Sequence, residues 1–199
     1  MNMMNRSETM PGTMLKKERP YSVRGRTEIL SGRAEGKALA ERVLKYLETL
    51  GPDRVLPLNF GKVRFIDFSC ADEFLTRVLR RIMSGELGTR FIVLKGMSHT
   101  VEENIAAALS IRDLVCPRID REGNIALLGK IGTELVDTYR LAARRRKITA
   151  RDVMEIAPHV RISAISNRLA KLQKMGLLVR IRDVAVRSGG RQFVYEPVC

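Results

Sequence analysis

The first two thirds of this 199-residue chain alternate between short apolar runs and amphipathic helical patterns. The strand patterns occupy 21–30, 54–60 and 90–96, and helix patterns follow them at 32–51, 69–85 and 98–114. Parallel strands need a crossover connection, which is usually a helix. The alternation therefore predicts an α/β layer, a mixed sheet with helices in which some strands pair in parallel.

Each predicted helix buries one apolar face. The residues on these faces are Leu39, Val43, Leu47 and Leu50 in the first helix, Phe74, Val78 and Ile82 in the second, and Val101, Ile105 and Leu109 in the third. Gly51 and Pro52 end the first helix. Pro57 predicts a kink or an edge position for its strand, because proline cannot donate to a sheet ladder. A hairpin is expected at 118–129, turning at residues 122–124.

The pattern changes after Gly129. Two helices are predicted at 132–147 and 149–158, a third lies within 161–180, and strands follow at 177–186 and 191–198. We expect N-caps at Thr133, at Thr149 in a capping box with Asp152, and at Ser163, with Gly176 just past the third helix. The chain thus divides into a disordered tail over 1–20, an α/β domain over 21–129 and an α+β domain over 130–199.

The stretch RISAISNRLAKLQKMGLLVR, residues 161–180, predicts an amphipathic helix. Ile165, Leu169, Leu172 and Met175 form its apolar stripe, and the opposite face is polar and basic. Residues 131–199 hold 14 Lys and Arg against 6 Asp and Glu, which is +8 of the chain's net charge of +14. Arginine predominates there, and its planar guanidinium suits phosphate. These features favour a nucleic-acid partner, although a merely solvated basic face is the alternative that charge leaves open.

The order helix, short helix, polar-faced helix and two strands resembles a winged helix-turn-helix domain over about residues 130–199. ISNRLAKLQKMGLLVR takes the place of the recognition helix and RSGGRQFVYEP that of the wing. The resemblance implies that the helix enters the major groove of double-stranded DNA and that the wing grips the duplex beside it. The residues expected to contact DNA are Arg161, Ser163, Ser166, Asn167, Arg168, Lys171, Arg187 and Arg191.

A second resemblance covers about residues 20–115. RVLPLNFGKVRFIDFSCADEFLTRVLRRI, residues 54–82, resembles the STAS-like fold of anti-sigma-factor antagonists and of a related family of domains of unknown function. Those domains have a strand, a loop ending near Asp-x-Ser, and a helix that begins at the serine. Asp67 and Ser69 stand in those places, whereas Cys70 replaces a frequent glycine and Asn59 a frequent aspartate.

Two roles for Ser69 stay open at this point. In the antagonist proteins the matching serine is phosphorylated by a partner kinase, so the resemblance implies a phosphorylation switch or partner site at Asp67 and Ser69. A phosphate would add a charge of about −1.5 to −2 at a helix N-terminus. The alternative is that Ser69 only caps its helix, with Asp72 three residues further on.

Enzyme and cofactor motifs are missing from the sequence. It has no Gly-rich phosphate loop ending in GK[ST], no GxSxG and no HExxH. The adjacent pairs Asp72–Glu73 and Glu102–Glu103 diverge on their helices and are expected to be solvated faces or caps. Neither histidine lies at metal-ligand spacing from a cysteine. We therefore expect no catalytic activity, no cofactor and no metal.

Features of the whole chain predict a cytoplasmic protein without membrane contact. No apolar run approaches the roughly 18 residues of a membrane span, and the first residues lack the apolar region of a secretory signal. The three cysteines, Cys70, Cys116 and Cys199, are odd in number and far apart, which fits a reducing compartment.

The sequence thus predicts a DNA-binding transcriptional regulator in which a STAS-like domain senses or docks a partner. The alternative is a partner-switching signalling adaptor, in which the STAS-like domain binds a kinase or an anti-sigma factor and the winged helix contacts protein. A homodimer would present two recognition helices to half-sites about one turn of DNA apart.

Overall fold

The α/β half is built on a mixed sheet of six strands. The computed structural model describes residues 15–185 and 191–199. The strands are β1 (Lys16–Lys17), β2 (Tyr21–Ser22), β4 (Arg54–Asn59), β6 (Arg90–Lys95), β7 (Val115–Ile119) and β8 (Ile125–Gly129). β1 and β2 both pair with β4, and β6, β7 and β8 follow in that order. All neighbouring pairs are parallel except β7 and β8, which form the expected hairpin.

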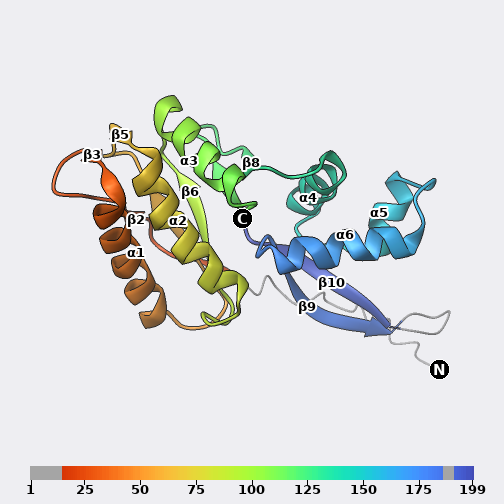
Figure 1. Ribbon diagram of the computed structural model, residues 1–199. Helices are drawn as coiled ribbons and strands as arrows, with labels where there is room; N and C mark the ends of the chain where they lie inside the picture. The colour runs from red at the N-terminus through yellow and green to blue at the C-terminus, as the bar shows by residue number, and fades with distance from the viewer. Residues whose placement is uncertain (1–14, 186–190) are drawn as a thin grey trace, which may run out of the picture.

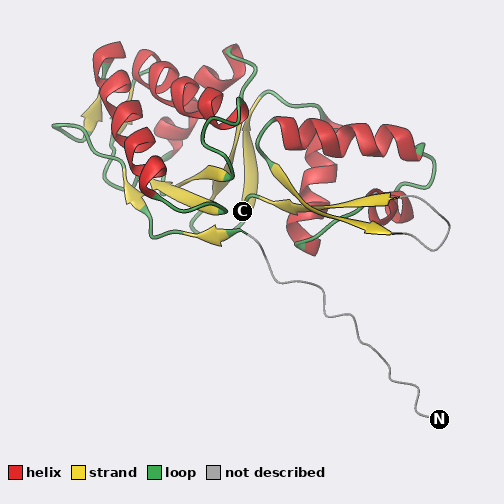
Figure 2. Cartoon of the chain, turned by 90° about the horizontal axis from the view of Figure 1, so that it is seen from below, coloured by secondary structure: helices red, strands yellow, loops and turns green. Residues whose placement is uncertain are grey.

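Three helices cover one face of this sheet (Figures 1 and 2). They are α1 (Gly32–Thr49), α2 (Phe68–Met83) and α3 (His99–Ile111). The chain steps from β2 to β4, β6 and β7 in one direction across the sheet, and right-handed crossovers that all step one way place their helices on one side. A short parallel pair, β3 (Ile29–Leu30) with β5 (Phe65–Ile66), leads into α1 and α2.

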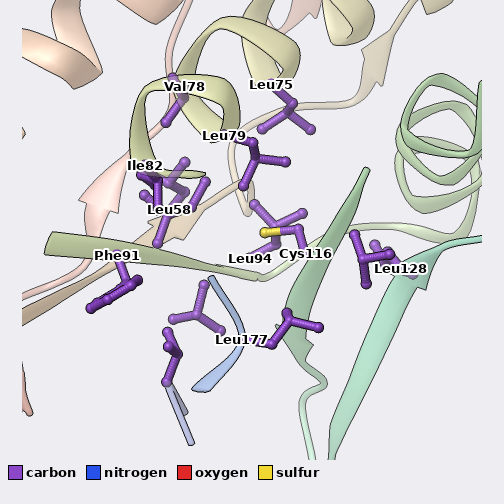
Figure 3. Close-up of a cluster of buried hydrophobic side chains, with 14 of the residues drawn as sticks. Leu58, Leu75, Val78, Leu79, Ile82, Phe91, Leu94, Cys116, Leu128 and Leu177 are labelled. Atoms are coloured by element: carbon purple, nitrogen blue, oxygen red, sulfur yellow. The ribbon is translucent and has the colours of Figure 1, made fainter. Parts of the chain in front are cut away.

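Residues of the C-terminal half of the chain pack against the other face of the sheet at β6. Phe91 and Val93 in β6 alternate with Ile92 and Leu94, so the two pairs point to opposite faces, and all four are buried. In Figure 3 the α2 residues lie on one side of β6, and Leu177 lies on the other. A sheet whose helices all lie on one side needs such a second layer, and here that layer comes from beyond residue 130.

The C-terminal half consists of three helices and an antiparallel hairpin. They are α4 (Thr133–Arg145), α5 (Ala150–Ile156), α6 (Ile162–Lys174), β9 (Leu178–Ala185) and β10 (Arg191–Pro197). α6 buries Ile165, Leu169 and Leu172, as its apolar stripe predicts. Buried hydrophobic residues of both halves belong to one continuous cluster.

The end of α6 turns the chain from helix into hairpin. Gly176 has a φ of +70°, a left-handed conformation that glycine adopts readily. The Leu177 N–H donates to the Leu172 carbonyl at 3.0 Å, and the Gly176 N–H donates to the Gln173 carbonyl at 2.9 Å. This pair of bonds is a Schellman motif, so the position expected for Gly176 is confirmed.

Two of the expected N-caps are wrong, and one is confirmed. Gly132, and not Thr133, precedes α4, and Arg161, and not Ser163, precedes α6. α4 begins one residue earlier than expected and α6 begins two residues earlier. A residue with an extended backbone and no capping side-chain bond precedes each helix, so side-chain capping does not set these two boundaries. The capping box of Thr149 and Asp152 at α5 has both of its hydrogen bonds.

The strand expected at 21–30 is not continuous. Only β2 and β3 at its two ends are strands, and the segment between them bends. At Gly25 the chain folds so closely on itself that a Cβ would lie 2.5 Å from the side chains of Leu30 and Glu35. Arg42 holds this bend by donating from Nη2 to the Arg24 carbonyl at 2.7 Å.

Pro57 lies in an interior strand, which corrects the kink or edge position expected for it. The Val55 and Asn59 carbonyls accept hydrogen bonds from the N–H groups of Glu18 and Val23. Alternate residues of β4 therefore turn their backbone groups toward β1 and β2, and Pro57 shares that side. It falls in the gap between β1 and β2, where no donor is needed.

Part of the expected disordered tail is ordered. Leu15 is buried, and the Lys16 N–H donates to the Asp53 carbonyl at 2.8 Å, which begins β1. The edge of β4 would otherwise present unpaired backbone groups, and this segment pairs with them. Within the described residues no helix is long and apolar enough to cross a membrane.

Candidate nucleic-acid interface

The outer face of α6 carries most of the side chains expected to contact DNA. Ser163, Ser166, Asn167 and Lys171 are exposed, because the opposite side of the helix holds the buried stripe. Residues three or four apart lie on the same side of a helix. Ser163, Asn167 and Lys171 therefore form a single row along the solvent side of α6.

The N-terminus of α6 is open. Arg161 stands at the N-cap position in an extended conformation, and no side chain caps the helix there. The first N–H groups of a helix have no partner within it, and they carry the positive end of the helix dipole. Arg161 is itself exposed. A cationic side chain and uncapped N–H groups thus meet at one end of the helix, an arrangement that suits a phosphate.

Arg168 differs from its neighbours in α6. It is half-buried, and together with Glu134 it lines two clefts. One, of about 620 Å³, lies between α4, α5 and the segment that follows α5, and the other, of about 430 Å³, lies between α4 and α6. Its guanidinium therefore belongs to the side of α6 that faces α4. Asn167 and Lys171 line the smaller of these clefts from its outer side.

The β9–β10 hairpin extends away from the α/β half, and its far end lies at the same end of the molecule as the N-terminus of α6 (Figure 1). Near its base the Arg180 guanidinium stacks over the Phe193 ring, 4.4 Å from the ring centre. Arg191 begins β10, and only its backbone is described. Arg187 lies outside the described residues.

Arginines at the end of α4 partly serve the fold. Arg145 Nη1 lies 3.3 Å from Asp152 Oδ1 and 3.4 Å from Glu155 Oε2, so it ties α4 to α5. Arg146 ends α4 with a φ of +64°. In the basic run that closes α4, Arg145 therefore forms ion pairs within the protein, whereas Arg144 and Arg146 are exposed to solvent.

Asp67 and Ser69 lie at the start of α2, and the capping role, one of the two left open for Ser69, belongs to Asp67. The N-cap is Asp67, whose Oδ1 accepts from the Cys70 N–H at 2.7 Å. Its Oδ2 accepts from Ser31 Oγ at 2.5 Å and from the Gly32 N–H at 2.8 Å. One carboxylate therefore holds the beginnings of α1 and α2 together, and Ser69 follows inside the first turn of α2, half-buried.

The electrostatics at Asp67 follow from these bonds. Burial raises the pKa of Asp67, but the hydrogen bonds from Ser31 and from the Cys70 and Gly32 N–H groups outweigh it, so the pKa lies below its ordinary value. Cys70 is fully buried, and burial, reinforced by the Asp67 and Glu35 carboxylates, raises the pKa of its thiol to about 12. Cys70 is therefore a protonated core residue at neutral pH.

Asp72 is buried, which corrects its expected place on a solvated face or in a cap. Arg112, at the end of α3, donates to it from Nε at 2.7 Å and from Nη2 at 2.6 Å. Thr76 Oγ1 adds a bond of 3.2 Å. The hydrogen bonds from Arg112 lower the pKa of Asp72 against the opposing effect of burial. This pair fastens α2 to α3.

Lys174 and Arg180 are basic residues of the same surface that sequence reasoning did not select. Both line a cleft beside the outer face of α6, together with residues from the end of α2. Lys174 could have been found from the helical period, because it lies seven residues after Asn167 on the same side. The place of Arg180 depends on how β9 leaves α6, which no local pattern encodes.

The exposed side chains of α6 and the residues that line the adjoining clefts form one continuous polar and basic surface. Among the side chains that the structure describes, in residues 15–181 and 192–199, no group of three or more His, Cys, Asp or Glu could hold a metal ion. Comparisons of the chain with protein-family models, with curated proteins and with solved structures found no significant match.

Proposed function

We propose that this protein is a DNA-binding transcriptional regulator whose residues 130–199 act as a winged helix-turn-helix module. The observation that carries the proposal is the outer face of α6, with an exposed polar and basic row and an uncapped N-terminus, beside a hairpin that extends at the same end. The net charge of +8 over residues 131–199 supports it. The α/β half, which resembles a STAS-like domain, would sense or dock a partner.

The residues of α6 fit distinct tasks in this proposal. Asn167 can pair with adenine in the major groove, and Ser163 or Ser166 can bond a base edge or a phosphate. Arg161 and the first N–H groups of α6 would hold a phosphate at the helix end. Lys171, further along the same row, would meet the DNA backbone. Arg168 would reach DNA only from the α4 side, so we expect a smaller part for it.

A salt titration of the full chain with labelled double-stranded DNA tests the proposal. Each phosphate that a Lys or Arg neutralises releases condensed counterions, so log affinity should fall linearly with log salt, with a slope of about −0.9 per phosphate contact. A surface with several phosphate contacts should show a steep slope. A flat dependence, or no preference for any genomic fragment over a polyanion competitor, would reject the regulator.

Single alanine substitutions test whether α6 forms the DNA-binding surface. Lys171→Ala should weaken binding across all sequences and reduce the salt slope by about one contact. Lys62→Ala removes the same charge from an exposed residue of the α/β half and is the matched control. Asn167→Ala should instead relax the sequence preference, at a cost of about 1–3 kcal/mol for the preferred base. Equal effects of Lys171→Ala and Lys62→Ala would mean that only overall charge matters.

A second candidate function is that of a partner-switching adaptor, and an exposed apolar surface favours it. Ile29 in β3 and Phe65 in β5 are 52% and 38% exposed on adjacent strands, just before the start of α2 that carries Ser69. Exposed apolar neighbours of this kind can mark a protein contact. A kinase or an anti-sigma factor docked here would have Ser69 within its footprint.

Phosphate mimicry separates the two candidates. In pull-down experiments Ser69→Asp should release a partner that the wild type and Ser69→Ala retain, because the added charge lies beside the Asp67 carboxylate. Phe65→Ser should release the same partner by removing apolar contact. A partner that responds in this way, in a protein that shows no salt-dependent DNA binding, would favour the adaptor over the regulator.

A further inference from the structure

A cleft of about 760 Å³ separates the end of α2 from the second half of α6. The α/β half contributes Ile82, Met83 and Phe91 to its wall, and the C-terminal half contributes α6 and Leu178 at the start of β9. This volume falls in the range of about 300–1,000 Å³ that is typical of small-molecule sites. The cleft therefore has the size of a ligand site and lies where the two halves meet.

The lining of the cleft combines apolar and neutral polar side chains with three cations. Lys171 and Lys174 line it from α6, and Arg180 lines it from β9. None of the described residues that line it is acidic, and neither lysine is paired with a carboxylate among the described side chains of residues 15–181 and 192–199. An occupant that complements this wall carries a negative head group on an apolar body.

The wall supplied by the α/β half is held in place before anything binds. In the turn after α2, Glu86 accepts from Arg81 Nε and from Ser84 Oγ, both at 2.9 Å. Arg90 donates to the Leu50 and Leu87 carbonyls at 2.8 and 2.9 Å. A wall already cross-linked by hydrogen bonds needs little ordering on binding, which favours affinity.

We propose that this cleft binds an amphipathic organic anion and that the bound anion competes with DNA. Asn167 and Lys171 line the cleft and also belong to the outer row of α6. An anion paired with Lys171 would remove that charge from the DNA-facing surface and would add its own negative charge beside it. The competition rests on the proposed function, whereas binding of the anion does not.

Calorimetric titration of the full chain with two probes tests the site. Dodecanoate, used below its critical micelle concentration, has an apolar chain with a carboxylate, and dodecyltrimethylammonium has the same chain with a positive head. The wild type should bind dodecanoate at least about tenfold more tightly than dodecyltrimethylammonium. Equal affinity for the two probes would overturn the proposal, because the three cations would then have no part in binding.

A pair of matched variants tests the location. Met83→Glu places a carboxylate on the apolar wall, at a residue 41% exposed and therefore tolerant of charge, and should weaken dodecanoate at least about tenfold. Ile111→Glu makes the same change at a residue 66% exposed that does not line the cleft, and it should leave dodecanoate affinity unchanged. Unchanged affinity in Met83→Glu would overturn the site.

The DNA arm uses the same proteins. Dodecanoate should raise the apparent Kd for DNA in the wild type and in Ile111→Glu. Met83→Glu carries a fixed carboxylate in the same cleft, so its apparent Kd for DNA should already be higher without dodecanoate and should show no further rise when dodecanoate is added. Dodecanoate binding that leaves DNA affinity unaltered would overturn the competition. Dodecanoate binding that responds to Met83→Glu in a protein with no DNA affinity would support the anion site and reject only the proposed function.

Discussion

Two aspartates show how single residues join distant parts of the α/β half. The Asp67 carboxylate accepts hydrogen bonds from Ser31 and Gly32, which lie more than 30 positions earlier, as well as from its own helix. The Asp72 carboxylate accepts hydrogen bonds from Arg112, which lies 40 positions later. Both carboxylates have a pKa below the ordinary value. Each therefore stabilises the fold in its ionised form.

The Asp72 pair predicts a specific acid response. Because the folded pKa lies below the ordinary 3.8, its stabilisation is complete above about pH 4 and is lost as the pH falls through the folded pKa. Asp72→Asn should therefore lower the denaturation midpoint at neutral pH, and its difference from the wild type should shrink in acid. Urea denaturation between neutral pH and about pH 3 measures this.

The control for this prediction is Glu41→Gln, on the exposed side of α1. It should follow the wild type across the whole range, because its contact with Lys37 is a solvent-exposed ion pair. A gap between Asp72→Asn and the wild type that stays constant in acid would show that Asp72 contributes through packing rather than charge.

At the scale of elements, the connection from α6 to β9 sets the geometry of the candidate interface. Gly176 ends α6 in a left-handed conformation, and a Cβ added there would lie 3.3 Å from Ile82 Cγ2 in α2. The same residue thus closes the helix and lets it approach the α/β half. The cleft beside α6 depends on this close approach.

Replacing Gly176 with alanine should be costly. A left-handed conformation disfavours alanine by about 1–2 kcal/mol, and the new methyl group meets Ile82. Gly51→Ala is the matched control, because Gly51 has no positive φ and a Cβ there meets nothing within 4 Å. Gly51→Ala should be neutral or stabilising by about 0.4–1 kcal/mol. If urea denaturation showed equal destabilisation by Gly176→Ala and Gly51→Ala, the role given to Gly176 would be contradicted.

At the scale of the whole molecule, the two halves share one core. The helices of the α/β half leave one side of the sheet open, and Leu177, which is fully buried, belongs to the layer on that side. The C-terminal Val198 joins the same region, where its N–H donates to the Leu177 carbonyl at 3.0 Å. Neither half buries its apolar surface alone, which favours cooperative unfolding of the chain.

Leu177→Ala should therefore destabilise both halves together, by about 2–5 kcal/mol. Hydrogen exchange should show that amides of β6 and of α6 lose protection in parallel, because one unfolding event exposes both. Ile111→Ala, at an exposed site, should change stability by less than about 0.5 kcal/mol. Loss of protection confined to the C-terminal half would mean that the halves unfold independently.

The sequence by itself determined the local elements of this protein. The buried stripe of α6, the capping box at Thr149 and the glycine that ends α6 follow from residues within a few positions of one another. Helical period and capping depend on such neighbours, so they can be predicted without the rest of the chain. The polar row of α6 was predictable for the same reason.

Only the tertiary structure decided what meets across long stretches of chain. It selected Asp67 over Ser69 as the cap, because Asp67 also binds the start of α1. It buried Asp72 against Arg112, and it packed Leu177 of the C-terminal half against the open side of the sheet at β6. Burial depends on partners tens of residues away, and packing must satisfy all of them at once. The cleft beside α6 exists only because those distant segments meet.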